Sequence, residues 1–340
     1  MEKLPYDTPS ELIYSSDLDD GFTRRGAGNG FAYYDEQNTL ISDEKTKHRL
    51  NSLAIPPAYT DVWYCAEENG YLQSTGIDTK GRKQYRYHPL WNEWRNLKKF
   101  NSLLDFAAVL PKIRRRVTRG LTSDELNKEK VLCSVVRLLD KTAARIGNEV
   151  YYKENGSTGL TTLRDDNVES DDGYLQLHYI AKGGTEREFD LYQPSLAEIV
   201  TELQDLPGQR LFQYVGIDKK IHPITSSDVN DWLKKVGEID LSAKDFRTWH
   251  ASELCLDHFL KQDEPDSNTA RVRLEKEVLK LVSAELGHRP PVCKKHYVHP
   301  QILKLQREGA LHSTMAKCDV VEVSSLTASE VNFISFLKAL

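Results

Sequence analysis

A tyrosine near the end of the sequence lies among basic residues, in GHRPPVCKKHYVHP (residues 287–300). A tyrosine hydroxyl can attack phosphorus and form a covalent phosphotyrosine, but a phenol with a pKa of about 10 needs help to react. Arginines suit the nonbridging phosphate oxygens, because a planar guanidinium pairs with two oxygens and keeps its charge. A lysine can give a proton to the departing oxygen. If Tyr297 is a nucleophile, the chain should also hold two arginines, a lysine and often a histidine.

Residues of these types occur in four short segments, each of which has an ordinary reading by itself. Arg145 could pair with Glu149 on a helix surface, worth roughly a few tenths of a kcal/mol. Arg247 could be a surface arginine of another helix, and Lys182 an exposed lysine of a hairpin. Tyr297 could fill a core. The segments are, in chain order, RIGNEVY (145–151), AKGGTE (181–186), KDFRTWHA (244–251) and GHRPPVCKKHYVHP (287–300).

Together these segments resemble the active-site motifs of type IB DNA topoisomerases, specifically their compact bacterial and poxvirus branch. IPPAYTDVWYC (55–65) and STGIDTKGRKQYRYHPLW (74–91) resemble the N-terminal DNA-binding domain of that branch. The likeness covers about residues 20 to 305. Each motif is weak alone, but the set is very specific.

The resemblance implies five catalytic residues. Tyr297 matches the nucleophile, and Arg145 and Arg247 match the two arginines that hold the scissile phosphate. His288 matches the residue that hydrogen-bonds a nonbridging oxygen, and Lys182 matches the general acid. Some bacterial members have Asn at the position of His288, which could also simply favour the end of a helix. The local sequence leaves four rivals of Lys182 open, namely Lys80, Lys83, Lys219 and Lys220.

Six further residues are candidates for contacts with duplex DNA: Arg82, Lys83, Gln84, Tyr85, Tyr87 and Tyr151. Five of them lie in GRKQYRY, where a strand would point alternate side chains to opposite faces. Glutamine can read adenine edges, and arginine or lysine can read guanine or bind phosphate. The resemblance implies that Gln84, Tyr85 and Tyr87 contact the major groove and that Tyr151 contacts a phosphate. The alternative is an ordinary amphipathic edge strand with packed tyrosines.

The distribution of charge also favours a polyanion as partner, although the net charge is −5. Between Lys80 and Arg119, twelve Lys and Arg face only Glu93 and Asp105, a balance of +10, whereas residues 1–50 carry −4. Affinity for nucleic acid depends on local neutralisation of phosphates, so one concentrated basic stretch is enough. The alternative is a solvated charged surface.

The apolar pattern predicts an α+β chain of two domains that must bring these segments together. Aromatic and β-branched residues alternate with polar ones from 31 to 90, which predicts a small, mainly antiparallel-β domain (1–95) with a short helix near 43–52. Helical spacing predicts a larger, mainly α domain (96–340) with a small β-hairpin at 173–191. The resemblance implies that the first domain binds DNA and that the second is catalytic. Residues 1–20 lack periodicity, and we expect them to be loosely ordered.

Within the larger domain we expect helices over 90–117, 122–152, 226–236, 243–261 and 269–286. The second would begin at a capping box from Thr122 to Glu125 and would carry both Arg145 and Tyr151. The last would end at Gly287, a good residue for a helix C-terminus, and two prolines would then interrupt the chain. The tail, 301–340, should be helical at both ends with a polar break near 313–327.

The resemblance implies an isomerase that relaxes supercoiled duplex DNA. It would cut one strand through a 3′-phosphotyrosyl intermediate, let the strand swivel and reseal it, without ATP, metal or any other cofactor. We expect a monomer that closes two lobes around the duplex, with no membrane partner. Five cysteines without a CxxC pair indicate free thiols in a reducing compartment. Together with the resemblance to the bacterial branch, they lead us to expect a cytoplasmic, nucleoid-associated protein.

Two alternatives stay open. A tyrosine recombinase uses a similar set of residues, but it usually has HxxR where this chain has KDFR, and its N-terminal domain is helical rather than β. A DNA-binding protein with a degenerate site would lack part of the five-residue set.

Overall fold

The computed structural model describes residues 4–5, 7–319 and 325–340. The chain divides into two compact units, Met1–Lys99 and Phe100–Leu340, called here the N-terminal and C-terminal units. No helix within the described ranges is both long enough and apolar enough to cross a membrane.

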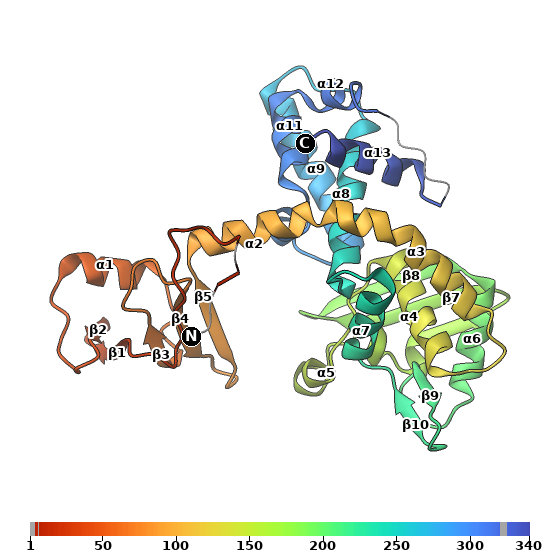
Figure 1. Ribbon diagram of the computed structural model, residues 1–340, viewed down its shortest axis with the longest axis horizontal. Coiled ribbons are helices and arrows are strands. Elements are labelled where there is room, and N and C mark those ends of the chain that lie inside the picture. The colour runs from red at the N-terminus through yellow and green to blue at the C-terminus, as the bar shows by residue number, and fades with distance from the viewer. Residues whose placement is uncertain (1–3, 6, 320–324) are drawn as a thin grey trace. The chain divides into compact units, whose positions relative to one another are not determined.

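An antiparallel sheet builds the N-terminal unit, which confirms its mainly β character (Figure 1). Helix α1 (Glu44–Ser52) lies where the sequence predicts it and begins after Asp43, whose carboxylate accepts a hydrogen bond from the Thr46 amide. Leu50 of α1 packs with Tyr33 and other buried residues of the sheet. In spatial order the strands are β2 (Gly30–Tyr34), β1 (Phe22–Ala27), β3 (Thr60–Tyr64), β4 (Leu72–Ile77) and β5 (Lys83–Tyr87).

Two features of this unit differ from the prediction. Strand β1 was not predicted, because its central residues, TRRG, have the polarity of a turn. The segment before it is not loose. Ser15 is buried, and its hydroxyl donates to the Leu72 carbonyl at 3.0 Å and accepts from the Leu72 amide at 3.1 Å. Ile13 forms an isolated bridge with Gly70. Residues 1–3 and 6 lie outside the described residues.

Helices dominate the C-terminal unit, and a small sheet interrupts them, as the sequence predicts (Figure 1). The sheet is antiparallel, in the order β6 (Val168–Asp171), β7 (Tyr174–Ala181), β8 (Thr185–Tyr192), and β9 (Gln213–Val215) pairs with β10 (Ile221–Pro223). The helices after α2 (Pro89–Asn101) are α3 (Leu103–Leu121), α4 (Lys128–Thr142), α5 (Glu149–Asn155), α6 (Pro194–Gln204), α7 (Ser226–Gly237), α8 (Ala243–Leu260), α9 (Asn268–Leu286), α10 (Pro290–His296), α11 (Pro300–Glu308), α12 (Leu311–Met315) and α13 (Ala328–Lys338).

The helices expected over 226–236, 243–261 and 269–286 are confirmed as α7, α8 and α9. The expected helix over 90–117 is instead two helices, α2 and α3, with a break at Ser102. Asn101 and Ser102 explain the break, because such side chains compete for backbone hydrogen bonds and favour helix ends. The tail is helical at both ends, as predicted, although residues 320–324 of its break lie outside the described ones.

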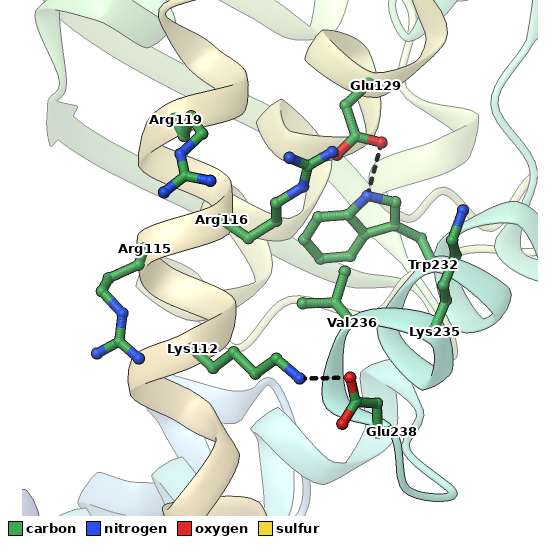
Figure 2. Close-up of a pocket in the computed structure, with 9 residues that line it drawn as sticks. All are labelled: Lys112, Arg115, Arg116, Arg119, Glu129, Trp232, Lys235, Val236 and Glu238. Carbon is green, nitrogen blue, oxygen red and sulfur yellow. Dashed lines mark hydrogen bonds and ion pairs between the residues drawn. The ribbon is translucent and has the colours of Figure 1, made fainter.

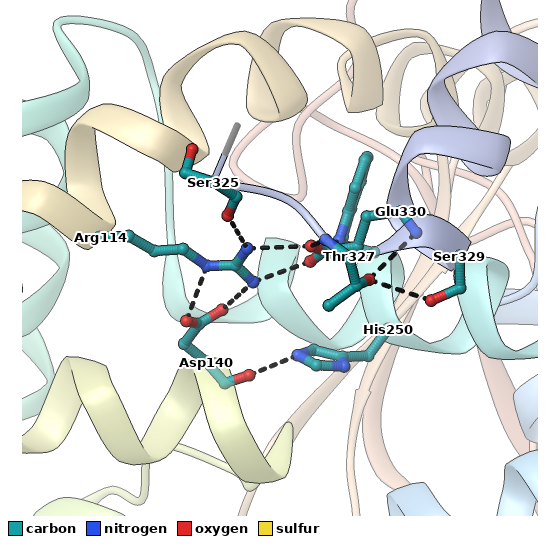
Figure 3. A network of polar contacts seen from close by, with 8 residues as sticks. Arg114, Asp140, His250, Ser325, Thr327, Ser329 and Glu330 are labelled. Carbon is teal, nitrogen blue, oxygen red and sulfur yellow. Dashed lines mark hydrogen bonds and ion pairs between the residues drawn. The ribbon is translucent and has the colours of Figure 1, made fainter. Parts of the chain in front are cut away.

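A buried polar network fixes the C-terminal helix α13 to the core (Figure 3). Arg114 of α3 donates to both carboxylate oxygens of Glu330 on α13, at 2.7 and 2.9 Å, and also forms an ion pair with Asp140 of α4. Burial is the largest single influence on Glu330 and would raise its pKa, but the hydrogen bonds from Arg114, Thr327 and Trp249, together with the charge of Arg114, lower that pKa. Trp249 of α8 donates to the same carboxylate at 3.3 Å. The network therefore joins α3, α4, α8 and α13 around one arginine.

Candidate active site

The C-terminal end of α9 gathers three arginines. The last carbonyls of a helix have no partner within it, and they form the negative end of the helix dipole, so they attract guanidinium groups. One arginine comes from strand β8, one from α8 and one from the loop after α4. The pairs are Arg187 with the carbonyls of Ala284 and Glu285, Arg247 with Leu286 at 2.8 Å, and Arg145 with Gly287 at 3.3 Å.

Gly287 ends α9, as the sequence predicts, and its backbone makes this gathering possible. Its φ of +63° lies in the left-handed region, which glycine enters without a Cβ penalty. A Cβ here would also lie 3.0 Å from Cδ of Arg187, so the arginine would have to shift. The turn directs the chain to His288, whose amide donates to the Ser283 carbonyl at 2.8 Å.

Arg145 lies in a loop, which contradicts the predicted helix over 122–152. Helix α4 does not begin at the expected capping box. It begins after Asn127, whose side chain accepts from the Lys130 amide, and it ends at Thr142. Residues 143–148 are not helical, and Tyr151 lies on a separate short helix, α5. Arg145 and Tyr151 therefore do not lie on the one helix that the sequence predicted for them.

Backbone contacts from a second loop hold Arg145 in place. The Leu160 amide donates to the Arg145 carbonyl at 2.9 Å. Gly147, with φ +93°, packs so closely on Gly159 that a Cβ on Gly159 would lie 2.5 Å from its backbone. Two glycines thus let the two loops touch and leave the guanidinium of Arg145 directed toward the end of α9.

His288 lies between the guanidinium groups of the two phosphate-binding candidates. Its Nδ1 is 3.0 Å from a terminal nitrogen of Arg145, and its Nε2 is 2.7 Å from one of Arg247. Burial first, and then the charges of Arg247, Arg145 and Arg187, lower the pKa of His288 to about 3, so the imidazole is neutral at physiological pH.

These contacts leave the site with more donors than acceptors. A neutral imidazole has one N–H and one acceptor nitrogen, whereas a guanidinium only donates. One of the two contacts of His288 must therefore bring two donors together. Arg247 is only 4% exposed, and its Nε has no hydrogen-bond partner among the described residues. An anion between these groups would supply the missing acceptors.

Tyr297 follows α10, against the same cluster. The two prolines before it, Pro290 and Pro291, do not interrupt the chain as predicted but begin α10, because proline fits the first turn of a helix. The ring of Tyr297 stacks on that of His288, with centroids 4.4 Å apart. The central carbon of the Arg247 guanidinium lies 5.5 Å from the centroid of the tyrosine ring.

A cavity of about 260 Å³ brings four of the five catalytic candidates together. Its walls include Tyr297, Arg145, Arg247 and Lys182, together with Tyr151 and Lys244. The fifth candidate, His288, touches three of them directly or through its ring. Among residues 4–5, 7–319 and 325–340, no three His, Cys, Asp or Glu side chains gather as potential metal ligands.

Lys182 is exposed at the tip of the β7–β8 hairpin, where the sequence predicts a Gly-Gly turn. Its ammonium nitrogen lies 4.9 Å from the ring centroid of Tyr151, which is 44% exposed. Two of the four rival lysines belong to the same unit as the cavity, and two do not. Lys80 and Lys83 belong to the N-terminal unit, and Lys219 and Lys220 belong to the turn between β9 and β10, which does not line the cavity.

Sequence reasoning missed Arg187 and gave Lys244 no role in the site. Arg187 is buried on β8, where its hydrogen bonds to α9 place its charge near His288. The sequence did contain a signal for Arg187. It stands two residues before Phe189 and four before Leu191, so a strand places all three side chains on the same, apolar face. Lys244 lies in the first turn of α8 and lines the cavity, three residues before Arg247.

The predicted DNA contacts of the N-terminal unit lie in and beside β5, the edge strand of its sheet. Asp78 binds the guanidinium of Arg82 through two hydrogen bonds and accepts one from Gln84 at 3.0 Å. Lys83 forms an ion pair with Asp17. Carboxylates therefore position these three side chains. A DNA phosphate that binds them would have to replace the carboxylate as their partner or bind beside it.

The two tyrosines of β5 have different surroundings. Tyr85 is 50% exposed. Tyr87 is half-buried in an aromatic cluster, with its ring centroid 5.9 Å from that of Tyr71 and 6.4 Å from that of Trp91. Tyr85 is thus available to a ligand, whereas much of Tyr87 packs within the unit.

The basic stretch is less uniform than its composition suggests. At least six of its twelve cations form ion pairs with described residues: Arg82, Lys83, Lys98, Lys112, Arg114 and Arg116. In the C-terminal unit, Figure 2 shows a groove between α3 and α7 where Lys112 pairs with Glu238. Arg115 and Arg119 line the same groove and have no ion-pair partner in the described part of the chain. Locally, then, only part of the +10 balance is available to a polyanion.

Comparisons with known proteins identify the family of the chain. Residues 88–319 match the family model of the eukaryotic DNA topoisomerase I catalytic core, and residues 30–78 match that of the bacterial DNA topoisomerase IB N-terminal domain. DNA topoisomerase 1B of Acanthamoeba polyphaga mimivirus is 30% identical over 299 residues, which cover 86% of this chain and 89% of the relative.

More distant relatives agree as well. DNA topoisomerase 1B of vaccinia virus (strain Copenhagen) is 22% identical over 304 residues, covering 86% of this chain and 92% of the relative. DNA topoisomerase 1 alpha of Arabidopsis thaliana is 24% identical over 200 residues, covering 58% of this chain and 21% of the relative. With a family model that spans most of the chain and a relative at 30% identity over nearly its whole length, the chain belongs to the type IB DNA topoisomerases.

Proposed function

We propose that this enzyme relaxes supercoiled duplex DNA by cutting one strand through a 3′-phosphotyrosyl bond to Tyr297. The hydroxyl oxygen of Tyr297 attacks the scissile phosphorus and releases its proton to solvent, while the bond to the 5′-oxygen breaks and that oxygen takes a proton from Lys182. The cut strand swivels, and the 5′-hydroxyl then attacks the phosphotyrosine and restores the DNA. The link to Tyr297 is itself a phosphodiester and conserves the energy of the DNA bond that it replaces, so resealing needs no ATP.

The excess of donors around His288 carries this proposal. Arg145 and Arg247 bring two guanidinium groups to one imidazole that can accept from only one of them. A phosphodiester would accept from both guanidinium groups and from the imidazole N–H. The same donors would stabilise the charge that develops on the nonbridging oxygens, which is the task of an oxyanion hole.

Lys182 supplies the proton for the departing 5′-oxygen in this proposal. It is exposed beside Tyr151 on the hairpin that borders the cavity, so it can approach a bound strand. The arginines carry the electrostatic work that a metal ion performs in other phosphoryl transferases. We further propose that the DNA-binding and catalytic domains, 1–95 and 96–340, close around the duplex as two lobes of a monomer.

Relaxation is expected to proceed without ATP and in the presence of EDTA, on plasmids of either supercoil sign. The reason is that the proposed chemistry uses only side chains of the chain and conserves the bond energy. Gel electrophoresis of topoisomers after incubation with the purified enzyme measures this. A strict requirement for Mg²⁺ or ATP would refute the mechanism.

Duplex affinity is expected to fall steeply as salt rises, because each neutralised phosphate releases counterions. Replacing Arg82, Lys83 and Arg86 by glutamine should reduce the slope of log affinity against log salt by up to about 2.7, at about 0.9 per lost contact. Binding titrations at several salt concentrations measure the slope.

A matched control uses Lys261→Gln and Arg273→Gln, which remove exposed cations of α8's end and α9 that form ion pairs within the chain. These changes should leave the slope unaltered. An unchanged slope in the β5 variant would show that this strand is not on the DNA path.

A further inference from the structure

The hydroxyl of Ser252 joins the two backbone groups on either side of Val298. It donates to the carbonyl of Tyr297 at 2.9 Å and accepts from the amide of His299 at 3.0 Å. Ser252 is fully buried on α8. A hydroxyl has one proton to give, so both contacts can form at once and leave it satisfied.

Both backbone groups lie where helices leave them without a regular partner. Tyr297 follows the last residue of α10, and His299 is the residue that caps the start of α11. A buried carbonyl or amide without a partner gives up its hydrogen bond to water and gains none in return, which destabilises the fold. One serine therefore satisfies the end of one helix and the beginning of the next.

The same helix carries Arg247, five residues before Ser252. The guanidinium of Arg247 contacts His288 and the ring of Tyr297, while the hydroxyl of Ser252 donates a hydrogen bond to the backbone carbonyl of Tyr297. Helix α8 thus carries the guanidinium proposed to bind phosphate and also holds the backbone of the proposed nucleophile. Because both contacts come from one helix, that helix fixes the distance between the two groups.

Other contacts hold the two residues that follow Tyr297. Val298 is buried. The imidazole of His299 lies edge-on to Phe100 and to Phe336 of α13, with centroids 5.2 and 6.0 Å apart, and its Nδ1 accepts from the Gln301 amide. We expect these contacts to keep α11 in place when Ser252 changes, so the substitution should act on the link between α8 and the backbone of Tyr297.

We propose that Ser252 is a positioning residue of the cleavage reaction, which holds the hydroxyl of Tyr297 in line with the phosphate that Arg247 binds. The proposal rests on the proposed function of Tyr297 as nucleophile. A misplacement of about 1 Å can cost roughly 100-fold in rate. Ser252→Ala should therefore slow single-turnover cleavage by about 10- to 100-fold, while the dissociation constant for duplex DNA stays within about twofold.

Ser134→Ala is the matched control. Ser134 is also fully buried, on α4, but its hydroxyl donates to the Lys130 carbonyl of its own helix at 3.0 Å. The control removes an equivalent hydroxyl without touching the tyrosine segment, and it should cleave at the wild-type rate. Thermal unfolding of both variants shows whether either change acts through stability, and Ser252→Thr, which keeps the hydroxyl, should recover most of the rate.

A duplex with sulfur in place of the bridging 5′-oxygen separates positioning from proton donation. Sulfur leaves without a proton, so it relieves a defect in the general acid but not a misplaced nucleophile. Ser252→Ala should remain slow on this substrate. Cleavage by Ser252→Ala at the rate of Ser134→Ala would overturn the role of Ser252 alone. Failure of the wild type to form an adduct at Tyr297 would overturn the proposed function and this role with it.

Discussion

Tyr297→Phe is expected to bind duplex DNA but to form no covalent adduct and to relax no supercoils. The substitution removes one oxygen atom and keeps the ring, which stacks on His288 at 4.4 Å. The arginine cluster should therefore survive, and the loss should report on the nucleophile alone. Denaturing gels of labelled duplex after incubation with enzyme measure the adduct, and filter binding measures affinity.

Tyr151→Phe is the matched control, because Tyr151 lines the same cavity and also carries a phenol. It lies on the exposed helix α5 and should contribute at most a phosphate contact. Its variant should still form the adduct. Adduct formation by Tyr297→Phe, with loss in Tyr151→Phe, would mean that the two assignments must be exchanged.

Lys182→Ala is expected to slow cleavage by about 10²- to 10⁴-fold, the usual scale for general acid catalysis. Replacing the bridging 5′-oxygen by sulfur should restore most of that rate, because a thiol is far more acidic than an alcohol and departs as the thiolate. Quenched-flow measurements of single-turnover cleavage on the two substrates give the comparison.

Three other variants are controls for the rescue of Lys182→Ala by sulfur. Arg145→Ala and Arg247→Ala should gain little from sulfur, since their task concerns the nonbridging oxygens. Lys244→Ala is the control for a second cavity-lining lysine and should respond like the wild type. If Lys182→Ala stays slow on the sulfur substrate while Lys244→Ala is rescued, the general acid lies on α8 and not on the hairpin.

The sequence predicted the elements whose pattern is local. Apolar periodicity located α7, α8 and α9, and the Gly-Gly turn located the β7–β8 hairpin that carries Lys182. Gly287 correctly marked the end of α9 because its left-handed backbone is a local requirement. The family motifs also selected side chains that the fold brings to one cavity, although they are separated by up to 152 residues from Arg145 to Tyr297.

The rest depended on contacts that periodicity does not contain. Apolar residues continue at helical spacing through Ile146, but the loop after Thr142 instead pairs its carbonyls with Leu160 and Thr161. Arg187 reads as one charge among several in TEREFDL, and only the end of α9 gives it partners. The twelve clustered cations similarly gave no sign of carboxylates such as Asp17 and Glu238, which are distant in sequence.

The most direct test of the account is the chemical structure of the covalent adduct. A nicked or suicide duplex should trap the enzyme on one strand, and protease digestion followed by mass spectrometry should then identify the joined residue and the DNA end. The account predicts an oligonucleotide joined through its 3′-phosphate to Tyr297, with a free 5′-hydroxyl on the other side of the break. A bond through a 5′-phosphate, or through a residue other than Tyr297, would contradict it.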